Sequence, residues 1–246
     1  MAQYRQGGFA GTPPVVKNLI IINVLALLGY YAFRGSFNLN WSLGLFYWGS
    51  EAFEPYQFIT HMFMHGGFAH LFFNMFALWM FGRVLENVWG SKRFFIYYFV
   101  TGLGAAFLHL LVNHISIQSM LSEMPQEQIN IVMERGLNAL REGKNFTDPA
   151  LRKLNSAMNI PTVGASGAVF GVLLAFGMLF PNTQLLLLFP PIPIKAKYFV
   201  IFYGILELIL GVTQPGSNVA HFAHLGGMLF GYILIKYWNK TSNRFY

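Results

Sequence analysis

The chain has 246 residues, of which 55% are hydrophobic and only 10% are charged. A soluble domain carries about 25% charged residues, so this composition excludes an ordinary water-facing surface and predicts a membrane protein. The net charge of +7 would suggest nucleic-acid binding in a soluble protein, but the positions of the basic residues favour another explanation. The absence of cysteine excludes disulfides, thiolate metal sites and cysteine nucleophiles.

A membrane-spanning helix needs about 20 mostly apolar residues. Six stretches meet or approach this length: 16–34, 58–82, 94–115, 163–180, 197–212 and 219–238. We therefore expect an all-α membrane protein built as a bundle of six transmembrane helices. The predicted organisation is an N-terminal cytoplasmic segment at 1–15, a membrane domain at 16–238 and a cytoplasmic tail at 239–246.

Lysine and arginine near the ends of spans indicate orientation, because cytoplasmic loops carry an excess of both. If both termini are cytoplasmic, ten of the 16 basic residues lie on the inner side. These ten are Arg5, Lys17, Arg83, Lys92, Arg93, Lys195, Lys197, Lys236, Lys240 and Arg244. Topology thus explains the basic excess, so we expect the lipid bilayer and not nucleic acid as a partner. The even-numbered spans then run from outside to inside.

Residues 116–162 form a polar, extracytoplasmic insertion between the third and fourth spans. Apolar residues recur there at helical spacing, namely Ile129, Val132, Met133, Leu137 and Leu140. Asp148 followed by Pro149 has the pattern of an N-cap and a first helical position. We expect two short amphipathic helices, which either lie on the lipid headgroups or form a docking surface for a substrate or partner.

The second span contains four polar residues: His61, His65, His70 and Asn74. His70 and Asn74 share a helix face, and their donors are suited to bind the oxyanion that forms when a serine attacks a carbonyl. A metal site made by the three histidines is an alternative, but no acidic residue nearby supports it. We therefore predict neither a metal nor a cofactor.

The fourth span opens with Gly164-Ala165-Ser166-Gly167, which puts Ser166 in its first turn. Small residues at helical spacing let membrane helices pack closely, so one interpretation of this motif is packing alone. The other is that a closely packed helix brings a base to the serine. The two interpretations are compatible.

The sixth span has His224 in its first turn or two, followed on the same face by Gly227 and Gly231. That face can pack against the fourth span, which puts Ser166 and His224 at similar depth. A serine within hydrogen-bond reach of an imidazole is the minimal activated nucleophile. His221 is a rival base, and we prefer His224 because it directly precedes the glycines.

The fifth span contains one acidic residue, Glu207, with no evident partner in the sequence. Ionisable residues inside a membrane are costly and often functional. We expect a gating or structural role for Glu207 rather than a catalytic one. The loop Thr213–Asn218 precedes His224 directly, and we consider it as a lid over the cavity.

The motifs around His70 and Asn74, Ser166, and His224 occur in an order that resembles the rhomboid family of intramembrane serine proteases. The resemblance covers about residues 15–238 apart from the long insertion. Bacterial members are also similar around 82–94 and 190–197. The resemblance implies a Ser-His dyad without an acid, transmembrane protein substrates, and a location in the cell (inner) membrane.

The resemblance also implies individual roles. Ser166 would be the nucleophile and His224 the general base and acid, with Asn74, His70 and the Ser166 amide forming the oxyanion hole. Phe170 stands where members often carry an aromatic ring that stacks on the base. The supporting residues would be His65, Phe170, Gly164, Gly227 and Gly231.

Two features depart from the family pattern. Tyr56 and Gln57 stand where members often carry a Trp-Arg pair, which leaves the anchoring of the first outer loop open, and the insertion is longer than a minimal core requires. The alternative function is a catalytically inactive rhomboid-like protein that binds membrane clients, although such a protein would normally lack the serine or the base. A transporter or channel is disfavoured because the chain lacks repeated halves and paired charges.

Overall fold

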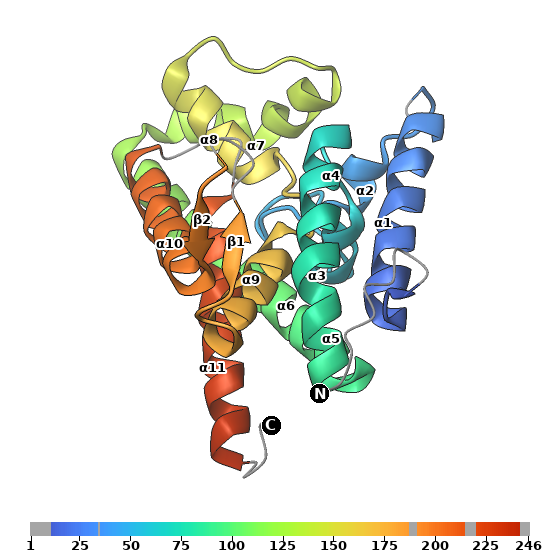
Figure 1. Ribbon diagram of the computed structural model, residues 1–246. Coiled ribbons are helices and arrows are strands. Elements are labelled where there is room, and N and C mark those ends of the chain that lie inside the picture. Colours follow the sequence, from blue (N-terminus) through green and yellow to red (C-terminus); the bar gives the residue numbers. More distant parts are fainter. Residues whose placement is uncertain (1–10, 34, 187–190, 215–219, 242–246) are drawn as a thin grey trace, which may run out of the picture.

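The structure is a computed structural model that describes residues 11–33, 35–186, 191–214 and 220–241. Over these residues the chain is mostly helical (Figure 1). Four helical segments are long and apolar enough to cross a membrane: Pro14–Phe33, Phe68–Trp89, Ser91–Glu123 and Ala196–Thr213. Large apolar side chains such as Leu25, Phe73 and Ile201 are exposed on them, as a lipid-facing surface requires. The protein is therefore a helical, multi-pass membrane protein.

The first half of the chain supplies α1 (Pro14–Phe33), α2 (Leu39–Leu43), α3 (Gln57–Thr60), a 3-10 turn (His61–Phe63), α4 (Phe68–Ala77), a π-helical turn (Leu78–Gly82), α5 (Arg83–Trp89) and α6 (Ser91–Glu123). The second half supplies α7 (Gln126–Arg141), α8 (Pro149–Asn159), α9 (Ser166–Leu179), α10 (Ala196–Thr213) and α11 (His221–Thr241). A small antiparallel hairpin joins α9 to α10, with β1 (Gln184–Leu186) paired to β2 (Pro193–Lys195) and Leu185 opposite Ile194.

Each of the six predicted spans corresponds to a helix, but the second has different bounds. It begins at Phe68 and not at residue 58, because α3 and the 3-10 turn precede it and Gly67 adopts an extended conformation immediately before α4. The helix α9 has only 14 residues, and α11 carries polar residues at both ends. The number of spans and the side on which the termini lie therefore stay predictions.

The insertion contains the two predicted amphipathic helices, α7 and α8, at one end of the bundle (Figure 1). The Asp148 side chain accepts hydrogen bonds from the amides of Ala150 and Leu151, which confirms the predicted N-cap. The long α6 continues past the predicted end of the third span to Glu123. A separate apolar cluster holds this end together: Tyr47, Ile117, Val132, Leu154 and Met158.

Gln57 anchors the loop between α1 and α4, whose anchoring the sequence leaves open. Its side chain is 1% exposed. Its Oε1 accepts from the amides of Phe46 and Glu54 at 3.3 and 3.1 Å, and its Nε2 donates to the Ala52 carbonyl at 2.9 Å. Tyr56 adds a hydrogen bond from its hydroxyl to the Ser42 carbonyl. A glutamine thus satisfies three backbone groups of this loop.

Glu86 holds the start of α1 from a distant part of the chain. Its buried carboxylate accepts from the amides of Val15 and Val16 at 2.9 and 2.8 Å, and from the Ser91 hydroxyl at 2.7 Å. The first amides of a helix have no partner within the helix, and a negative charge there interacts favourably with the helix dipole. Glu86 therefore ties α1 to the junction of α5 and α6.

We expect Glu86→Ala to lower the free energy of unfolding by about 2 kcal/mol, because it leaves buried amides without acceptors. The measurement is the apparent melting temperature in detergent micelles. The matched control is Glu134→Ala, which removes an exposed carboxylate from α7. Equal melting temperatures for the two variants would show that Glu86 does not stabilise the fold.

Candidate functional site

A cavity of about 1000 Å³ lies between α4, α6, α9 and α11, next to α8. Its lining includes the sequence-predicted residues His70, Asn74, Gly164, Ser166, Phe170 and His224. The helices α9 and α11 both begin at this cavity. Chain segments from the second, fourth and sixth predicted spans therefore meet here.

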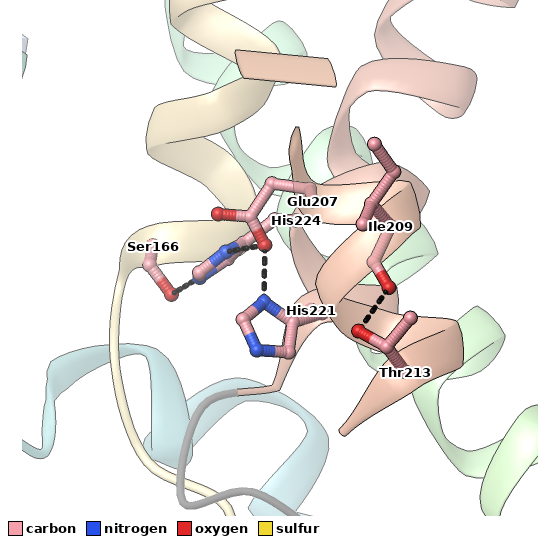
Figure 2. Close-up of polar contacts among 6 residues, drawn as sticks. All are labelled: Ser166, Glu207, Ile209, Thr213, His221 and His224. Atoms are coloured by element: carbon pink, nitrogen blue, oxygen red, sulfur yellow. Dashed lines mark hydrogen bonds and ion pairs between the residues drawn. The ribbon is translucent and has the colours of Figure 1, made fainter. Parts of the chain in front are cut away.

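Ser166 and His224 are in direct contact (Figure 2). Ser166 is the first residue of α9, and its Oγ lies 2.8 Å from Nε2 of His224, near the start of α11. His224 is buried, with 8% of its surface exposed. The two side chains come from residues 58 positions apart in the sequence. A hydroxyl and an imidazole at this distance are able to exchange a proton.

Glycines let α9 and α11 approach closely enough for this contact. A Cβ atom at Gly227 would overlap the Gly167 carbonyl, and one at Gly231 would overlap the Tyr97 hydroxyl. The same Tyr97 hydroxyl donates to the Gly171 carbonyl of α9 at 2.8 Å. The predicted glycine face of the last helix thus lies against the backbone of α9 and the side chain of Tyr97 from α6.

Phe170 lies parallel to the His224 ring, with centroids 4.2 Å apart and planes at 5°. Phe170 follows Ser166 by one helical turn on α9, so the same helix carries the hydroxyl and the ring that faces the imidazole. Stacking of this kind restricts rotation of the imidazole.

The prediction that Glu207 is isolated is wrong. Its Oε2 lies 2.7 Å from Nδ1 of His221 and 2.9 Å from Nδ1 of His224, and all three side chains are buried (Figure 2). The partners come from α11, whereas Glu207 is on α10, so the pattern within one span gives no signal of this contact. His221 thus contacts Glu207, while Ser166 is hydrogen-bonded to His224.

His70 and Asn74 lie on α4 and line the same cavity as Ser166. A Cβ at Gly164 would come within 2.8 and 2.9 Å of the His70 ring, so this ring rests directly on the Gly164 backbone. Gly164 has a φ of +132°, a conformation that favours glycine. The Nδ2 of Asn74 is buried and has no hydrogen-bond partner among the described residues. An unpaired buried donor is costly unless a ligand or water uses it.

His65 and His61 lie before α4, and His61 lines the same cavity as Ser166. The His65 ring packs edge-on against His70 with centroids 5.0 Å apart, and its carbonyl accepts from Asn40 Nδ2 at 3.1 Å. Nδ1 of His61 contacts the Gln57 carbonyl at 2.8 Å, and burial lowers the pKa of His61 to about 4. Both histidines thus have local packing contacts in the loop that leads into α4.

One group among the described residues brings metal-ligand types together, namely Glu207, His221 and His224. Two ligands on a tetrahedral zinc, each bonded at about 2.0–2.1 Å, are roughly 3.3 Å apart. The Nδ1 to Oε2 distances of 2.7 and 2.9 Å are shorter than this separation and match direct contact between the carboxylate and the two rings. The geometry therefore favours direct pairing of these side chains over metal binding.

The hypothesis of a lid at Thr213–Asn218 falls mostly outside the described residues.

Residues 52–240 match the family model described as Rhomboid domain. The chain is 28% identical over 186 residues to Rhomboid protein 1, mitochondrial, of Saccharomyces cerevisiae. That alignment covers 76% of this chain and 42% of the yeast protein. It is 27% identical over 214 residues to RHOMBOID-like protein 12, mitochondrial, of Arabidopsis thaliana, covering 86% and 55%. It is 24% identical over 183 residues to Putative rhomboid protease YdcA of Bacillus subtilis, covering 74% and 66%. The matched regions thus span between 42% and 66% of the length of these relatives.

We expect Gly227→Ala to separate α9 from α11, because the added methyl overlaps backbone and not a flexible side chain. Overpacking of this kind costs about 1–3 kcal/mol, so the apparent melting temperature in micelles should fall. The control is Gly204→Ala on α10, whose Cβ meets only the flexible end of Met228 at 3.3 Å. Equal stability of the two variants would contradict the close helix contact.

Proposed function

The chain belongs to the rhomboid family, and from that premise we propose that it is an intramembrane serine endopeptidase that cleaves transmembrane segments of other membrane proteins. The observation that carries the proposal is the 2.8 Å contact between Ser166 Oγ and His224 Nε2 inside a cavity. The family relatives from Bacillus subtilis named Rhomboid protease GluP and Putative rhomboid protease YdcA add support.

In the proposed reaction His224 Nε2 takes the proton from Ser166 Oγ while the oxygen attacks the scissile carbonyl carbon. The peptide C–N bond then breaks, and His224 gives that proton to the leaving amine. Water attacks the resulting serine ester while His224 takes a proton from it, the ester C–O bond breaks, and His224 returns that proton to Ser166 Oγ. The stacked ring of Phe170 keeps the imidazole in place through both steps.

Asn74, His70 and the Ser166 amide are the proposed donors to the oxyanion. The unpaired Nδ2 of Asn74 supports this role, because Asn74 lines the cavity and no described residue accepts a hydrogen bond from this donor. His65, Gly164, Gly227 and Gly231 support the site through packing. These residues act by position and take no part in bond making.

Hydrolysis also requires water and an accessible carbonyl. The cavity offers space for water next to Ser166. A carbonyl within a substrate helix is hydrogen-bonded and shielded, so the substrate must unwind locally before attack. We therefore expect substrates with small or helix-weakening residues near the outer membrane face.

We also propose six spans with both termini cytoplasmic, the membrane domain at 16–238, and a location in the cell (inner) membrane. The excess of Lys and Arg on one side supports this orientation. The family includes relatives with mitochondrial names as well as bacterial ones, so membership alone does not specify the membrane. The proposal of the cell membrane rests on the similarity to the bacterial members. The insertion at 116–162 then covers the outer end of the bundle.

The alternative function is a catalytically inactive rhomboid-like protein that binds membrane clients. The presence of both the hydroxyl and the imidazole at hydrogen-bond distance disfavours it. Such a protein would bind a transmembrane reporter without shortening it.

We expect Ser166→Ala and His224→Ala each to reduce cleavage of transmembrane reporters by at least about 10⁴-fold, since either change removes the activated nucleophile. The assay is appearance of the shortened reporter in proteoliposomes, with a panel of reporter sequences. The matched control is Ser116→Ala, a serine that lines the same cavity from α6. Cleavage by Ser166→Ala at the wild-type rate would refute the proposal, and reporter binding without cleavage by the wild type would favour the inactive client binder.

We expect Asn74→Ala to lower kcat by about 10²- to 10³-fold with little change in KM, because the lost donor acts mainly in the transition state. The control is Asn113→Ala, which also removes an amide from the cavity wall but one that donates to the Ala157 carbonyl. A rise in KM at unchanged kcat would assign Asn74 to substrate binding and not to the oxyanion.

A further inference from the structure

Among the residues that the structure describes, Glu207 is the one buried acid whose oxygen touches the proposed base. It is 7% exposed on α10, and its Oε2 contacts Nδ1 of both His221 and His224 (Figure 2). We propose that Glu207 is a positioning residue that adds a fixed negative charge beside the Ser166–His224 pair, with His221 holding the carboxylate in place. This inference rests on the proposed function of the site.

The burial of Glu207 requires a partner. A carboxylate within a membrane-spanning helix is costly unless another group compensates its charge or takes its hydrogen bonds. Among the described residues, its ion-pair contacts are with His221 and His224 alone. Both histidines lie on α11, so the acid links α10 to the helix that carries the base.

The contacts of Glu207 with His221 and with His224 differ in hydrogen-bond geometry. The 2.7 Å contact with His221 has the geometry of a hydrogen bond, so Nδ1–H of His221 donates to the carboxylate. The 2.9 Å contact with His224 has hydrogen-bond length, but Oε2 lies outside the direction in which an Nδ1–H would point. His221 thus fixes the carboxylate, and the carboxylate acts on His224 mainly as a neighbouring negative charge.

The negative charge of Glu207 favours the form of His224 that can accept the serine proton. A carboxylate next to Nδ1 favours the tautomer that carries its hydrogen there, which leaves the Nε2 lone pair free to accept from Ser166. When the serine proton moves to Nε2, the ring becomes an imidazolium beside Glu207. The opposite charge stabilises that state, and the proton does not pass to the acid.

Phe170 limits the contribution that Glu207 makes to catalysis in this proposal. Its ring already holds the imidazole plane through the stacked contact at 4.2 Å. Removal of the charge should therefore leave His224 near Ser166 but with a less favourable imidazolium. An aligned triad acid is worth about 10⁴-fold in kcat, and the unaligned contact here should be worth less.

The experiment compares Glu207→Gln, Glu207→Asp and His221→Gln with wild type in the reporter assay. We expect Glu207→Gln to lower kcat by about 10- to 100-fold at unchanged KM and melting temperature, and to slow labelling by a fluorophosphonate to the same extent. Glu207→Asp should recover part of the loss, because it retains the charge. His221→Gln should cost less than tenfold and add nothing in the Glu207→Gln background.

The matched control is Thr213→Val, which removes from the same helix a hydrogen bond that the Thr213 hydroxyl donates to the Ile209 carbonyl (Figure 2). Wild-type kcat in Glu207→Gln, while Ser166→Ala is inactive, would overturn this inference and leave the protease proposal standing. A change in KM alone would also overturn it, in favour of a gating role. If Glu207→Gln fails to fold, Glu207→Leu replaces it, because an apolar residue suits a membrane helix and also removes the charge; wild-type kcat in that variant would equally overturn the inference. Full activity of Ser166→Ala would instead refute the proposed function.

Discussion

The contact between α9 and α11 at Gly167 and Gly227 is the constraint on which the site depends. No Cβ fits between the two backbones at this point. The serine is adjacent to one glycine, and the histidine lies three residues before the other. Because the helices cannot move apart without losing this contact, Ser166 Oγ and His224 Nε2 are kept at 2.8 Å. Small residues thus do in the membrane what bulky side chains do in a soluble core: they determine how helices fit.

A second constraint is that buried polar groups need partners where water is scarce. Two buried acids meet it in different ways. Glu86 receives the free amides of α1, and this contact fixes one helix to the rest of the bundle. Glu207 receives two histidines at the cavity, where its charge adjoins the proposed base. Asn74 keeps an unpaired donor beside the same cavity. The buried polar groups Glu207 and Asn74 therefore both adjoin the place where the proposed reaction would develop charge.

Much of this arrangement follows from local patterns in the sequence. Apolar runs predict the helices, Asp148 and Pro149 predict the start of α8, and the glycines after His224 predict the close helix face. The pairing of Glu207 with His221 and His224 could not be predicted, since it joins two helices whose relative rotation no single-helix pattern specifies. The start of α4 was misplaced because the apolar residues before Gly67 form α3 and a short turn. The anchoring role of Gln57 likewise depends on three backbone groups of an irregular loop.

Covalent capture is the most direct way to test whether His224 makes Ser166 a reactive nucleophile. The purified protein in micelles would be treated with a fluorophosphonate and digested, and the modified peptide located by mass spectrometry. We expect a single adduct on Ser166 of the wild type. The His224→Ala variant, which retains the serine, should show no adduct. An unmodified Ser166 in protein that cleaves reporters, or equal modification with and without His224, would contradict this expectation.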